Sequence, residues 1–247
     1  MLLGIFGDIH GNLAALSAVI DDGRKNGVER WICLGDICFR GPQPVECLEL
    51  LAGMDTLTCI AGNTDQWLFR GFPAMAHFPP ERRRQLEAFR KWALSRMSKD
   101  HLKWLEAAPF CHSLAHGEEN LLFVHASPYS TEDWLPPSAA DESFRPMITG
   151  HNATIVVSGH VHVPYLRRIS GRYVLNAGST GHPTDNNNRA SYLLLELADY
   201  QTDGGSCLGI TFRRVPYNLE LTAEAARLTG MPMAEEYISA LRTGVPL

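Results

Sequence analysis

The sequence predicts an α/β fold built as a single domain over residues 1–247. In the amino-terminal two-thirds, short apolar runs alternate with amphipathic stretches, which is typical of buried strands joined by helices. The strands expected after this region are closely spaced, so the carboxy-terminal part adds further β-structure. A chain that is 45% hydrophobic and 20% charged at this length can bury one substantial core.

The first elements follow one another in strand–helix order. The expected elements are strands over residues 2–6, 31–34 and 57–60 and helices over 13–26 and 45–51. Asn12 is placed to cap the first helix, and Gly27 is placed to end it. Strands joined in this way through helices form a sheet with right-handed crossovers.

Residues 66–109 are expected to form a helical insertion that lies over one edge of the α/β core. Apolar residues recur at intervals of three and four over residues 81–97, which predicts an amphipathic helix. A second helix is expected over residues 99–107. We interpret the basic run 82–84 as a solvated helix face rather than a phosphate site.

From residue 110 onward the pattern predicts a β-rich region. The expected strands cover residues 110–114, 120–125, 154–158, 163–169, 173–175, 191–197 and 209–215. The first two flank a short polar turn and read as a hairpin. Residues 218–243 are expected to be a helical tail, which Gly230 and Pro232 break into two helices.

Charge and composition exclude several classes of protein. The net charge is -5, which disfavours nucleic acid as the main partner because a polyphosphate needs a basic surface. No apolar run approaches the roughly 20 residues that a membrane span requires, so no membrane partner is expected. The first residues do not resemble a secretory signal, and the 6 cysteines form no C-x-x-C pair. We therefore expect free thiols and a cytoplasmic location.

Several predicted strands are followed by side chains of the types that can bind metal ions. These residues are Asp8, His10, Asp36, Asn63, His125, His160 and His162. Ligands of α/β sheets bind at the carboxyl ends of the strands, so we expect these side chains to converge. Seven donors are too many for one tetrahedral zinc ion but suit two metal ions that share a bridging carboxylate. Carboxylate, imidazole and amide donors without a thiolate favour manganese, iron or zinc, then cobalt or nickel, with manganese favoured.

The motifs that carry these residues resemble those of the calcineurin-like metallophosphoesterases. The matching segments are Gly7–Asn12, Gly35-Asp36 with Gly41, Gly62–Asp65, Val124–Ala126 and Gly159–His162, in this order. The resemblance extends over roughly the first 200 residues. It implies an αββα sandwich of two mixed sheets flanked by helices, with the site at one edge.

The resemblance also implies a role for each residue. Asp8, His10 and His162 would bind the first metal ion. Asn63, His125 and His160 would bind the second, and Asp36 would bridge both ions. Arg40 matches an arginine that contacts the substrate phosphate in protein-phosphatase-like members of the family, and its planar guanidinium suits that task.

Two departures from the family pattern bear on the substrate. The family's presumed general acid is a histidine, and Thr64 stands in its place; a threonine cannot protonate an alkoxide near neutral pH. A small bacterial and archaeal subgroup that resembles phosphodiesterases also lacks this histidine, so esters with good leaving groups are expected to be favoured. Thr184 occupies a position that is often arginine in such proteins, which removes one expected phosphate contact.

Alternative roles stay open for the residues around this site. Arg40 either contacts phosphate or forms a surface salt bridge, and Asn12 either contacts phosphate or only caps its helix. His182 lies in a glycine-rich segment and is a candidate for the missing general acid. Asp65 is expected to cap a helix that begins at Gln66.

The function that we expect is hydrolysis of a small phosphoester substrate by a metal-bridging hydroxide. A phosphodiester is favoured over a monoester as the substrate. One alternative is a protein phosphatase or a dinucleoside-polyphosphate hydrolase, as the arginine motif at Arg40 suggests. A second alternative is a protein-binding scaffold that keeps the fold without catalysis. The physiological substrate, the native metal pair and the oligomeric state stay open at this point.

Overall fold

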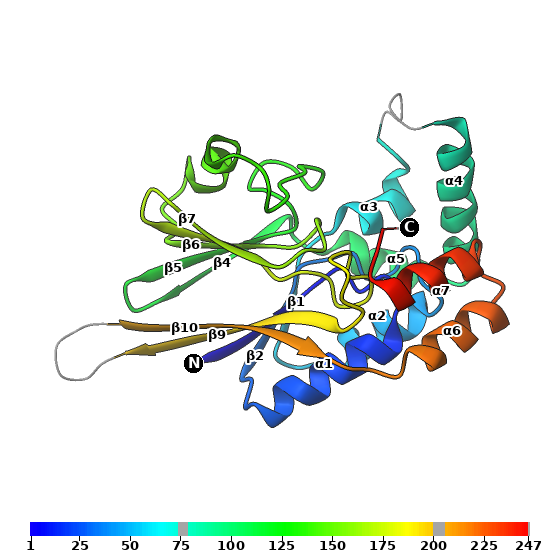
Figure 1. Ribbon diagram of the computed structural model, residues 1–247, viewed down its shortest axis with the longest axis horizontal. Coiled ribbons are helices and arrows are strands. Elements are labelled where there is room, and N and C mark those ends of the chain that lie inside the picture. Colours follow the sequence, from blue (N-terminus) through cyan, green and yellow to red (C-terminus); the bar gives the residue numbers. More distant parts are fainter. Residues whose placement is uncertain (74–78, 200–205, 247) are drawn as a thin grey trace.

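The computed structural model describes residues 1–73, 79–199 and 206–246. Two five-stranded sheets lie face to face as a sandwich (Figure 1). Both sheets mix parallel and antiparallel strands, and helices flank them. The predicted fold class, an α/β sandwich of two mixed sheets, is therefore confirmed.

The first sheet has the strand order β10-β9-β1-β2-β3. Its strands are β1 (Leu2–Phe6), β2 (Arg30–Cys33), β3 (Leu57–Cys59), β9 (Ala190–Asp199) and β10 (Ser206–Val215). The three amino-terminal strands run parallel, whereas β9 is antiparallel to β1. Because helices and the second sheet cover its two faces, β1 is a continuous apolar run rather than an alternating one.

The second sheet has the strand order β4-β5-β6-β8-β7. Its strands are β4 (Cys111–His116), β5 (Glu119–Val124), β6 (Ile155–Ser158), β7 (Tyr165–Ile169) and β8 (Arg172–Asn176). The central strands β5, β6 and β8 are parallel, and an antiparallel strand closes each edge. The predicted hairpin over residues 110–125 is the pair β4–β5.

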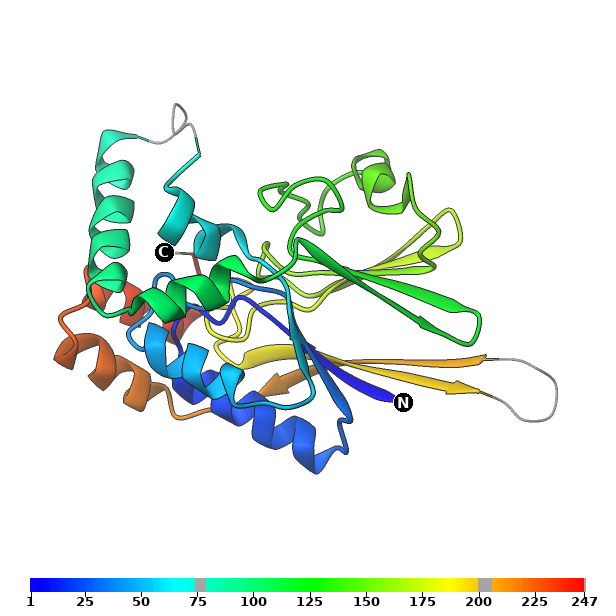
Figure 2. The ribbon, with the colours of Figure 1, turned by 180° about the vertical axis from the view of Figure 1, so that it is seen from behind.

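Helices cover the outer face of the first sheet and gather at one end of the sandwich (Figure 2). They are α1 (Leu13–Lys25), α2 (Pro44–Ala52), α3 (Asn63–Arg70), α4 (Pro80–Leu94), α5 (Lys99–Glu106), α6 (Leu219–Leu228) and α7 (Ala234–Thr243). α1 packs on β9 and β10, and α6 packs on both α1 and α7. A 3₁₀ helix, η1 (Asp141–Ile148), packs on β7 and β8 of the second sheet.

Three apolar clusters form the core, one for each contact between layers. Phe6, Leu16 and Tyr192 belong to the cluster between the first sheet and its helices. Ile5 and Phe123 belong to the cluster between the two sheets. A third cluster packs η1 on the second sheet. The two sheets are thus fixed to each other by apolar contacts, which positions the loops at their ends.

Two elements depart from the sequence prediction. The helix expected over residues 81–97 ends at Leu94, and η1 was not predicted because a 3₁₀ helix with an internal Pro146 has no 3.6-residue period. The described helices include none with the length and apolar character to cross a membrane. Cys33, Cys38, Cys47, Cys59 and Cys111 are free thiols, whereas the side chain of Cys207 lies outside the described part.

Candidate metal centre

All seven predicted metal ligands lie together at one end of the sandwich. Asp8 and His10 follow β1, Asp36 follows β2, Asn63 begins α3, His125 follows β5, and His160 and His162 follow β6. Six of them form two groups whose ligand atoms lie within 4.8 Å of one another, Asp8 with His10 and His162, and Asp36 with His125 and His160. The seventh, Asn63, lies next to His125, with its Oδ1 2.9 Å from Nε2 of that ring. Both sheets therefore contribute side chains to the same place.

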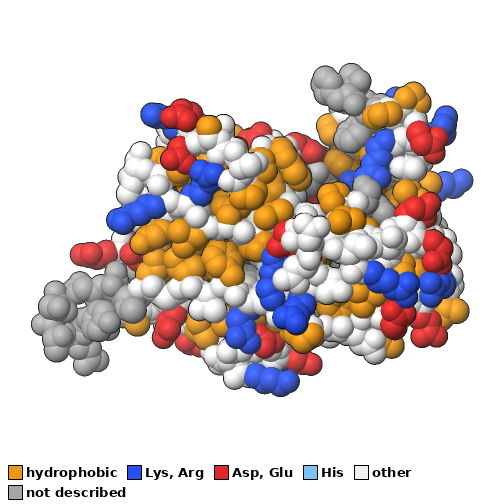
Figure 3. Space-filling model, viewed as in Figure 1, with side chains coloured by type: hydrophobic (Ala, Val, Ile, Leu, Met, Phe, Trp, Pro, Cys, Tyr) orange, Lys and Arg blue, Asp and Glu red, His pale blue; other side chains and the backbone are white. Residues whose placement is uncertain are grey.

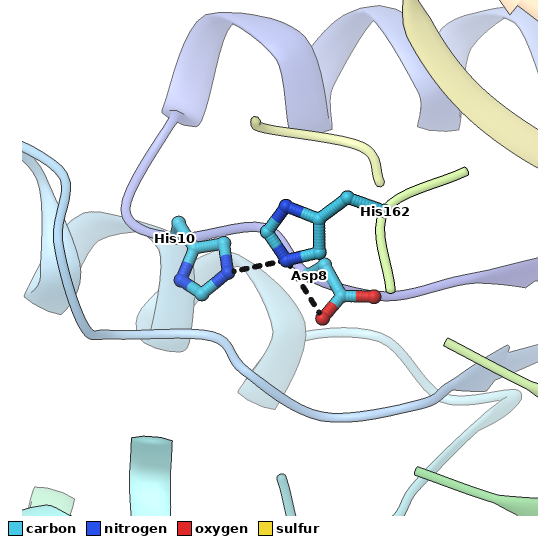
Figure 4. Close-up of side chains that lie close together, drawn as sticks. All are labelled: Asp8, His10 and His162. Carbon is cyan, nitrogen blue, oxygen red and sulfur yellow. Dashed lines mark hydrogen bonds and ion pairs between the residues drawn. The ribbon is translucent and has the colours of Figure 1, made fainter. Parts of the chain in front are cut away.

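In the first group, two histidine rings face each other through the same kind of nitrogen atom (Figure 4). Nδ1 of His10 lies 2.8 Å from the carbonyl oxygen of Phe39, and Nδ1 of His162 lies 2.6 Å from that of His182. A carbonyl oxygen only accepts hydrogen bonds, so Nδ1 carries the proton in both rings. In the neutral rings, Nε2 then keeps a lone pair, and the two Nε2 atoms are 3.0 Å apart.

This arrangement fits a metal cation. Two facing lone pairs repel each other unless a proton or a cation lies between them. Oδ1 of Asp8 lies 3.3 Å from Nε2 of His162, and it has no hydrogen-bond partner among the described residues. A carbonyl group that fixes the tautomer of each ring is the outer shell that metal-binding histidines usually have.

The second group repeats the pattern, with the amide of Asn63 in the place that the carboxylate of Asp8 has in the first. Nδ1 of His125 lies 2.7 Å from the carbonyl oxygen of Leu34, so its Nε2 also faces the centre. That Nε2 lies 2.9 Å from Oδ1 of Asn63 and 3.2 Å from Nδ1 of His160. In the tautomer of His160 that carries its proton on Nε2, three electron-pair donors converge here.

Asp36 lies between the two groups. Its Oδ1 accepts a hydrogen bond from the backbone N–H of Thr64 at 2.9 Å. Its Oδ2 lies 3.8 Å from Nε2 of His10, in the first group, and 3.6 Å from Nε2 of His125, in the second. One carboxylate therefore faces both groups of ligands, which is the position a bridging ligand needs.

Burial keeps several of these groups in the form that binds a cation. Burial and the neighbouring His162 hold the pKa of His10 well below its ordinary value. Burial and the proximity of His125 lower the pKa of His160 to about 3, so both rings are neutral at neutral pH.

Burial raises the pKa of Asp36, and the nearby carboxylate of Asp8 also raises it. Without a cation, the centre thus holds two carboxylates that repel each other.

The backbone at this centre adopts a conformation that residues other than glycine rarely take. The residues with positive φ include Asp8 (50°), His10 (48°), Asp36 (56°), Arg40 (77°), His160 (69°) and His162 (60°). Left-handed backbone costs on the order of 1–3 kcal/mol for each such residue and persists only where the surrounding structure enforces it. The concentration of this strain at the ends of β1, β2 and β6 marks the centre as a functional site.

Two glycines allow the loops to approach this closely. A Cβ atom on Gly41 would lie 1.6 Å from the carbonyl oxygen of His10. A Cβ atom on Gly62 would lie 2.2 Å from Oδ1 of Asp36. Any larger residue at either position would displace a predicted ligand.

A cavity of about 490 Å³ opens above the two groups. Its lining includes His10, Asp36, Arg40, Asn63, Thr64, Trp67, Glu132, Trp134, Pro136, His160, Val161, His162, Val163, His182, Thr184 and Pro246. The volume lies within the range of about 300–1,000 Å³ that small-molecule sites have. Asp8 and His125 are fully buried.

Arg40 is the positive charge of this cavity. Burial and the charge of Arg82 together lower its pKa to about 10, so the guanidinium stays charged at neutral pH. Its Nε is buried without a hydrogen-bond partner, and no salt bridge to Arg40 is found among residues 1–73, 79–199 and 206–246. The alternative role of Arg40, a surface salt bridge, is therefore not found in the described part of the chain. A desolvated guanidinium without a partner suits an anion in the cavity.

The other two predicted substrate residues differ in their access to the cavity. His182 lines it, and neither ring nitrogen has a hydrogen-bond partner within the described part of the chain. Asn12 does not line it; its amide group donates to the carbonyl oxygen of Gly181 and to Tyr217, and its Oδ1 accepts from the N–H of Ala15. Asn12 is thus the N-cap of α1, with both amide protons engaged in the fold.

The prediction for Asp65 was wrong. Helix α3 already begins at Asn63, so Asp65 lies in its first turn and does not cap it. Its carboxylate instead accepts the backbone N–H groups of Ile37 and Cys38, each at 3.0 Å. Burial and the charge of Asp36 together raise the pKa of Asp65 to about 7. Asp65 therefore supports the loop that carries Asp36.

Glu132 is the residue of the site that sequence reasoning missed. Its Oε2 accepts a hydrogen bond from Nδ2 of Asn63 at 3.0 Å, and its Oε1 accepts one from Nε1 of Trp67 at 2.9 Å. The amide nitrogen of Asn63 is thereby turned toward Glu132, so the amide oxygen points at the centre. Glu132 lies in an irregular loop, and the sequence carries no motif that identifies it.

The interpretation of the basic run 82–84 as a solvated face holds for two of its three members. Arg83 pairs with Glu87, and Arg84 pairs with Glu81, on the exposed side of α4. Arg82 is half-buried, and its guanidinium donates a 3.4 Å hydrogen bond to Gln85. Its charge acts on Arg40, so α4 adds to the positive potential at the cavity.

Comparison with known proteins agrees with this geometry. The chain is 27% identical over 226 residues to the uncharacterized protein MJ0912 of Methanocaldococcus jannaschii, covering 82% of this chain and 85% of that protein. It is 33% identical over 123 residues to a symmetrical bis(5'-nucleosyl)-tetraphosphatase of Azotobacter vinelandii, covering 49% of this chain and 42% of that protein. The crystal structure of a metallophosphoesterase from Sphaerobacter thermophilus matches with a TM-score of 0.74 at 27% identity, over 99% of each chain. Residues 1–200 match the calcineurin-like phosphoesterase superfamily domain, and the chain belongs to this family.

Proposed function

We propose that this chain is a phosphodiesterase that depends on two divalent metal ions. The observation that carries the proposal is the pair of Nε2 atoms of His10 and His162, which face each other at 3.0 Å beside the unpartnered Oδ1 of Asp8. This donor set needs a cation, and the unpaired guanidinium of Arg40 in the same cavity needs an anion. A phosphoester is the simplest ligand that meets both needs, because its anionic oxygens can contact the cations and the guanidinium of Arg40.

The ligands divide between the ions as the geometry groups them. Asp8, His10 and His162 would hold one ion, Asn63, His125 and His160 the other, and Asp36 both. Nitrogen and oxygen donors without a thiolate suit manganese first. When bound, two such cations activate a water molecule for attack on phosphorus and neutralise the charge that develops there.

Arg40 orients the substrate and stabilises the charge on its phosphate oxygens. Thr64, at the position of the family's general acid, does not protonate a leaving alkoxide. Burial and the charge of His162 hold the pKa of His182 well below its ordinary value, so this ring is neutral until an anion binds beside it. His182 therefore donates a proton only in the substrate complex, and leaving groups that need no proton are the best substrates.

The test is metal analysis together with hydrolysis of bis(p-nitrophenyl) phosphate. We expect about two metal ions per chain, turnover in the presence of Mn²⁺ and loss of turnover after chelation. A series of aryl and alkyl phosphodiesters should show rates that fall as the pKa of the leaving group rises. If the chemical step is rate-limiting and the rate does not depend on the pKa of the leaving group, the inference that the site lacks a general acid is wrong.

Hydrolysis of dinucleoside polyphosphates is the second candidate. The matched relative from Azotobacter vinelandii is named for that activity, and Arg82 beside Arg40 offers a second charge for a longer phosphate chain. Faster turnover of a dinucleoside tetraphosphate than of bis(p-nitrophenyl) phosphate would favour it over the diesterase. A phosphoprotein phosphatase would instead prefer phosphopeptides in the same assay.

A protein-binding scaffold is the non-enzymatic alternative. A scaffold has no need of strained ligand loops, yet every ligand position here is filled and six site residues carry left-handed backbone. Metal binding without turnover of any substrate in the panel would favour the scaffold.

A further inference from the structure

We propose that Trp134 is a stacking platform that selects phosphoesters with a planar aromatic group, such as a nucleobase, beside the reacting phosphate. This inference rests on the proposed phosphoesterase function and names the class of its substrate. The first observation is exposure. The side chain of Trp134 is 63% exposed, whereas Trp31 and Trp67 are 4% and 5% exposed. An exposed indole gives up the stabilisation that a large apolar side chain gains by burial.

The second observation is position. Trp134 lines the cavity, and its ring meets that of His160 edge to face, with the centroids 5.7 Å apart. Because His160 is a predicted ligand, the indole lies beside the candidate metal centre, within the cavity that a bound phosphoester would occupy. The neighbouring lining residues Pro136, Val161 and Val163 are apolar. These residues and Trp134 offer apolar contacts for a flat group but carry no charge that could bind a second phosphate.

The third observation is that the loop presents the indole in a fixed place. Glu132, two residues before Trp134, accepts hydrogen bonds from Asn63 and Trp67. Asp133 accepts a hydrogen bond from Oγ of Ser127 at 2.5 Å. A platform held by its own loop loses little conformational entropy when the ligand binds.

The unpartnered guanidinium of Arg40 lines the same cavity, and the charge of Arg82 acts on it. The cavity therefore offers a cation for the phosphate and an aromatic side chain for the rest of the molecule. Stacking of a base on an aromatic side chain contributes about 1–3 kcal/mol and tolerates any base.

Two substrates with the same leaving group test the inference. They are the p-nitrophenyl ester of thymidine 5'-monophosphate and ethyl p-nitrophenyl phosphate, both assayed with Mn²⁺. We expect Trp134→Leu to lower kcat/KM for the thymidine ester by about 5- to 100-fold and to change that for the ethyl ester less than twofold. Trp134→Phe should retain most of the activity on the thymidine ester because it keeps a π-face.

Tyr129→Leu is the matched control. Tyr129 is an exposed aromatic residue of the same loop, at 60%, but it does not line the cavity, so its removal should affect neither ester. Equal losses on both esters in Trp134→Leu, or full activity of this variant on the thymidine ester, would overturn the stacking role. Full activity would instead point to an alkyl or lipid substituent.

Failure of the proposed function gives a different result. If the wild-type protein hydrolyses neither ester, the phosphodiesterase assignment is wrong, and binding to the manganese-loaded protein then tests the subsite alone. Calorimetry should show tighter binding of thymidine 5'-monophosphate than of ethyl phosphate, and Trp134→Leu should remove the difference. Equal affinities in the wild-type protein would overturn the inference.

Discussion

The polar cluster around Asp22 and the candidate metal centre use similar side chains but differ in how far their groups are paired. Asp22 accepts hydrogen bonds from Tyr192 at 2.6 Å and from Nε and Nη2 of Arg213 at 3.0 and 2.8 Å. In the centre, Asp8 Oδ1 has no hydrogen-bond partner among the described residues, and His10 and His162 face each other through lone pairs. A polar cluster whose groups are all paired stabilises the fold, whereas an unpaired one is stabilised by its ligand.

The same change, aspartate to asparagine, should have opposite effects in the two clusters. Asp36→Asn should lower kcat by more than the roughly 10- to 100-fold that loss of an outer-shell partner causes, because Asp36 faces both groups of ligands. In the metal-free protein, the melting temperature should stay the same or rise, since the change removes a buried charge that repels Asp8. Steady-state kinetics and calorimetric melting of chelated protein measure both effects. A large fall in the metal-free melting temperature would mean that Asp36 serves the fold instead.

The effect of Glu132→Gln should be smaller, because Glu132 acts on the centre through Asn63. Glutamine can accept only one of the two hydrogen bonds, so the amide of Asn63 is no longer held with its oxygen toward the centre. We expect the affinity for the second Mn²⁺ ion to fall by about 10- to 100-fold, with activity partly restored by excess Mn²⁺. Isothermal titration calorimetry measures the two affinities separately.

The control for this variant is Glu119→Gln. Glu119 also accepts a side-chain hydrogen bond, from Thr154, but lies outside the cavity. The Glu119→Gln variant should leave both Mn²⁺ affinities unchanged. If Glu132→Gln does so too, the orientation of Asn63 does not depend on Glu132.

The smallest effect is expected for Asp22→Asn, which should reduce stability without reducing activity. The hydrogen bonds from Arg213 lower the pKa of Asp22, with Tyr192 contributing. Its carboxylate therefore stabilises the fold above the unfolded-state pKa of about 3.9, and this contribution is lost as pH falls through the lower folded-state pKa. We expect the variant to lose about 1 kcal/mol at pH 7, because the pair is partly exposed, and to match the wild type in strong acid. Urea unfolding at pH 7 and pH 3 checks this; a difference of the same size at both would contradict the charge-based account.

The sequence predicted which side chains come together at the centre because each follows an apolar run that is recognisable on its own. Once the runs before Asp8 and Asp36 are identified as parallel strands, their carboxyl ends must lie at the same sheet edge. The structure brings together the residues that this argument names, although their binding of metal stays a proposal.

What the sequence did not predict depends on contacts between distant segments. Local patterns indicate that an aspartate near a helix start is a cap, but the partners of Asp65 are the N–H groups of another loop. Glu132 and Trp134 lie in a loop without periodicity, where hydrogen bonds such as that from Ser127 to Asp133 determine the path. The orientation of Arg82 likewise depends on how α4 packs.

The loops of the centre come from both sheets, and this has a consequence for assembly. Asp8 and Asp36 follow strands of the first sheet, whereas His125 and His160 follow strands of the second. If both proposed metal ions bind, their ligands would come from both layers and would join the layers at their shared end. Metal uptake would then report that the two sheets have docked, because a chain whose sheets have separated would have no complete site.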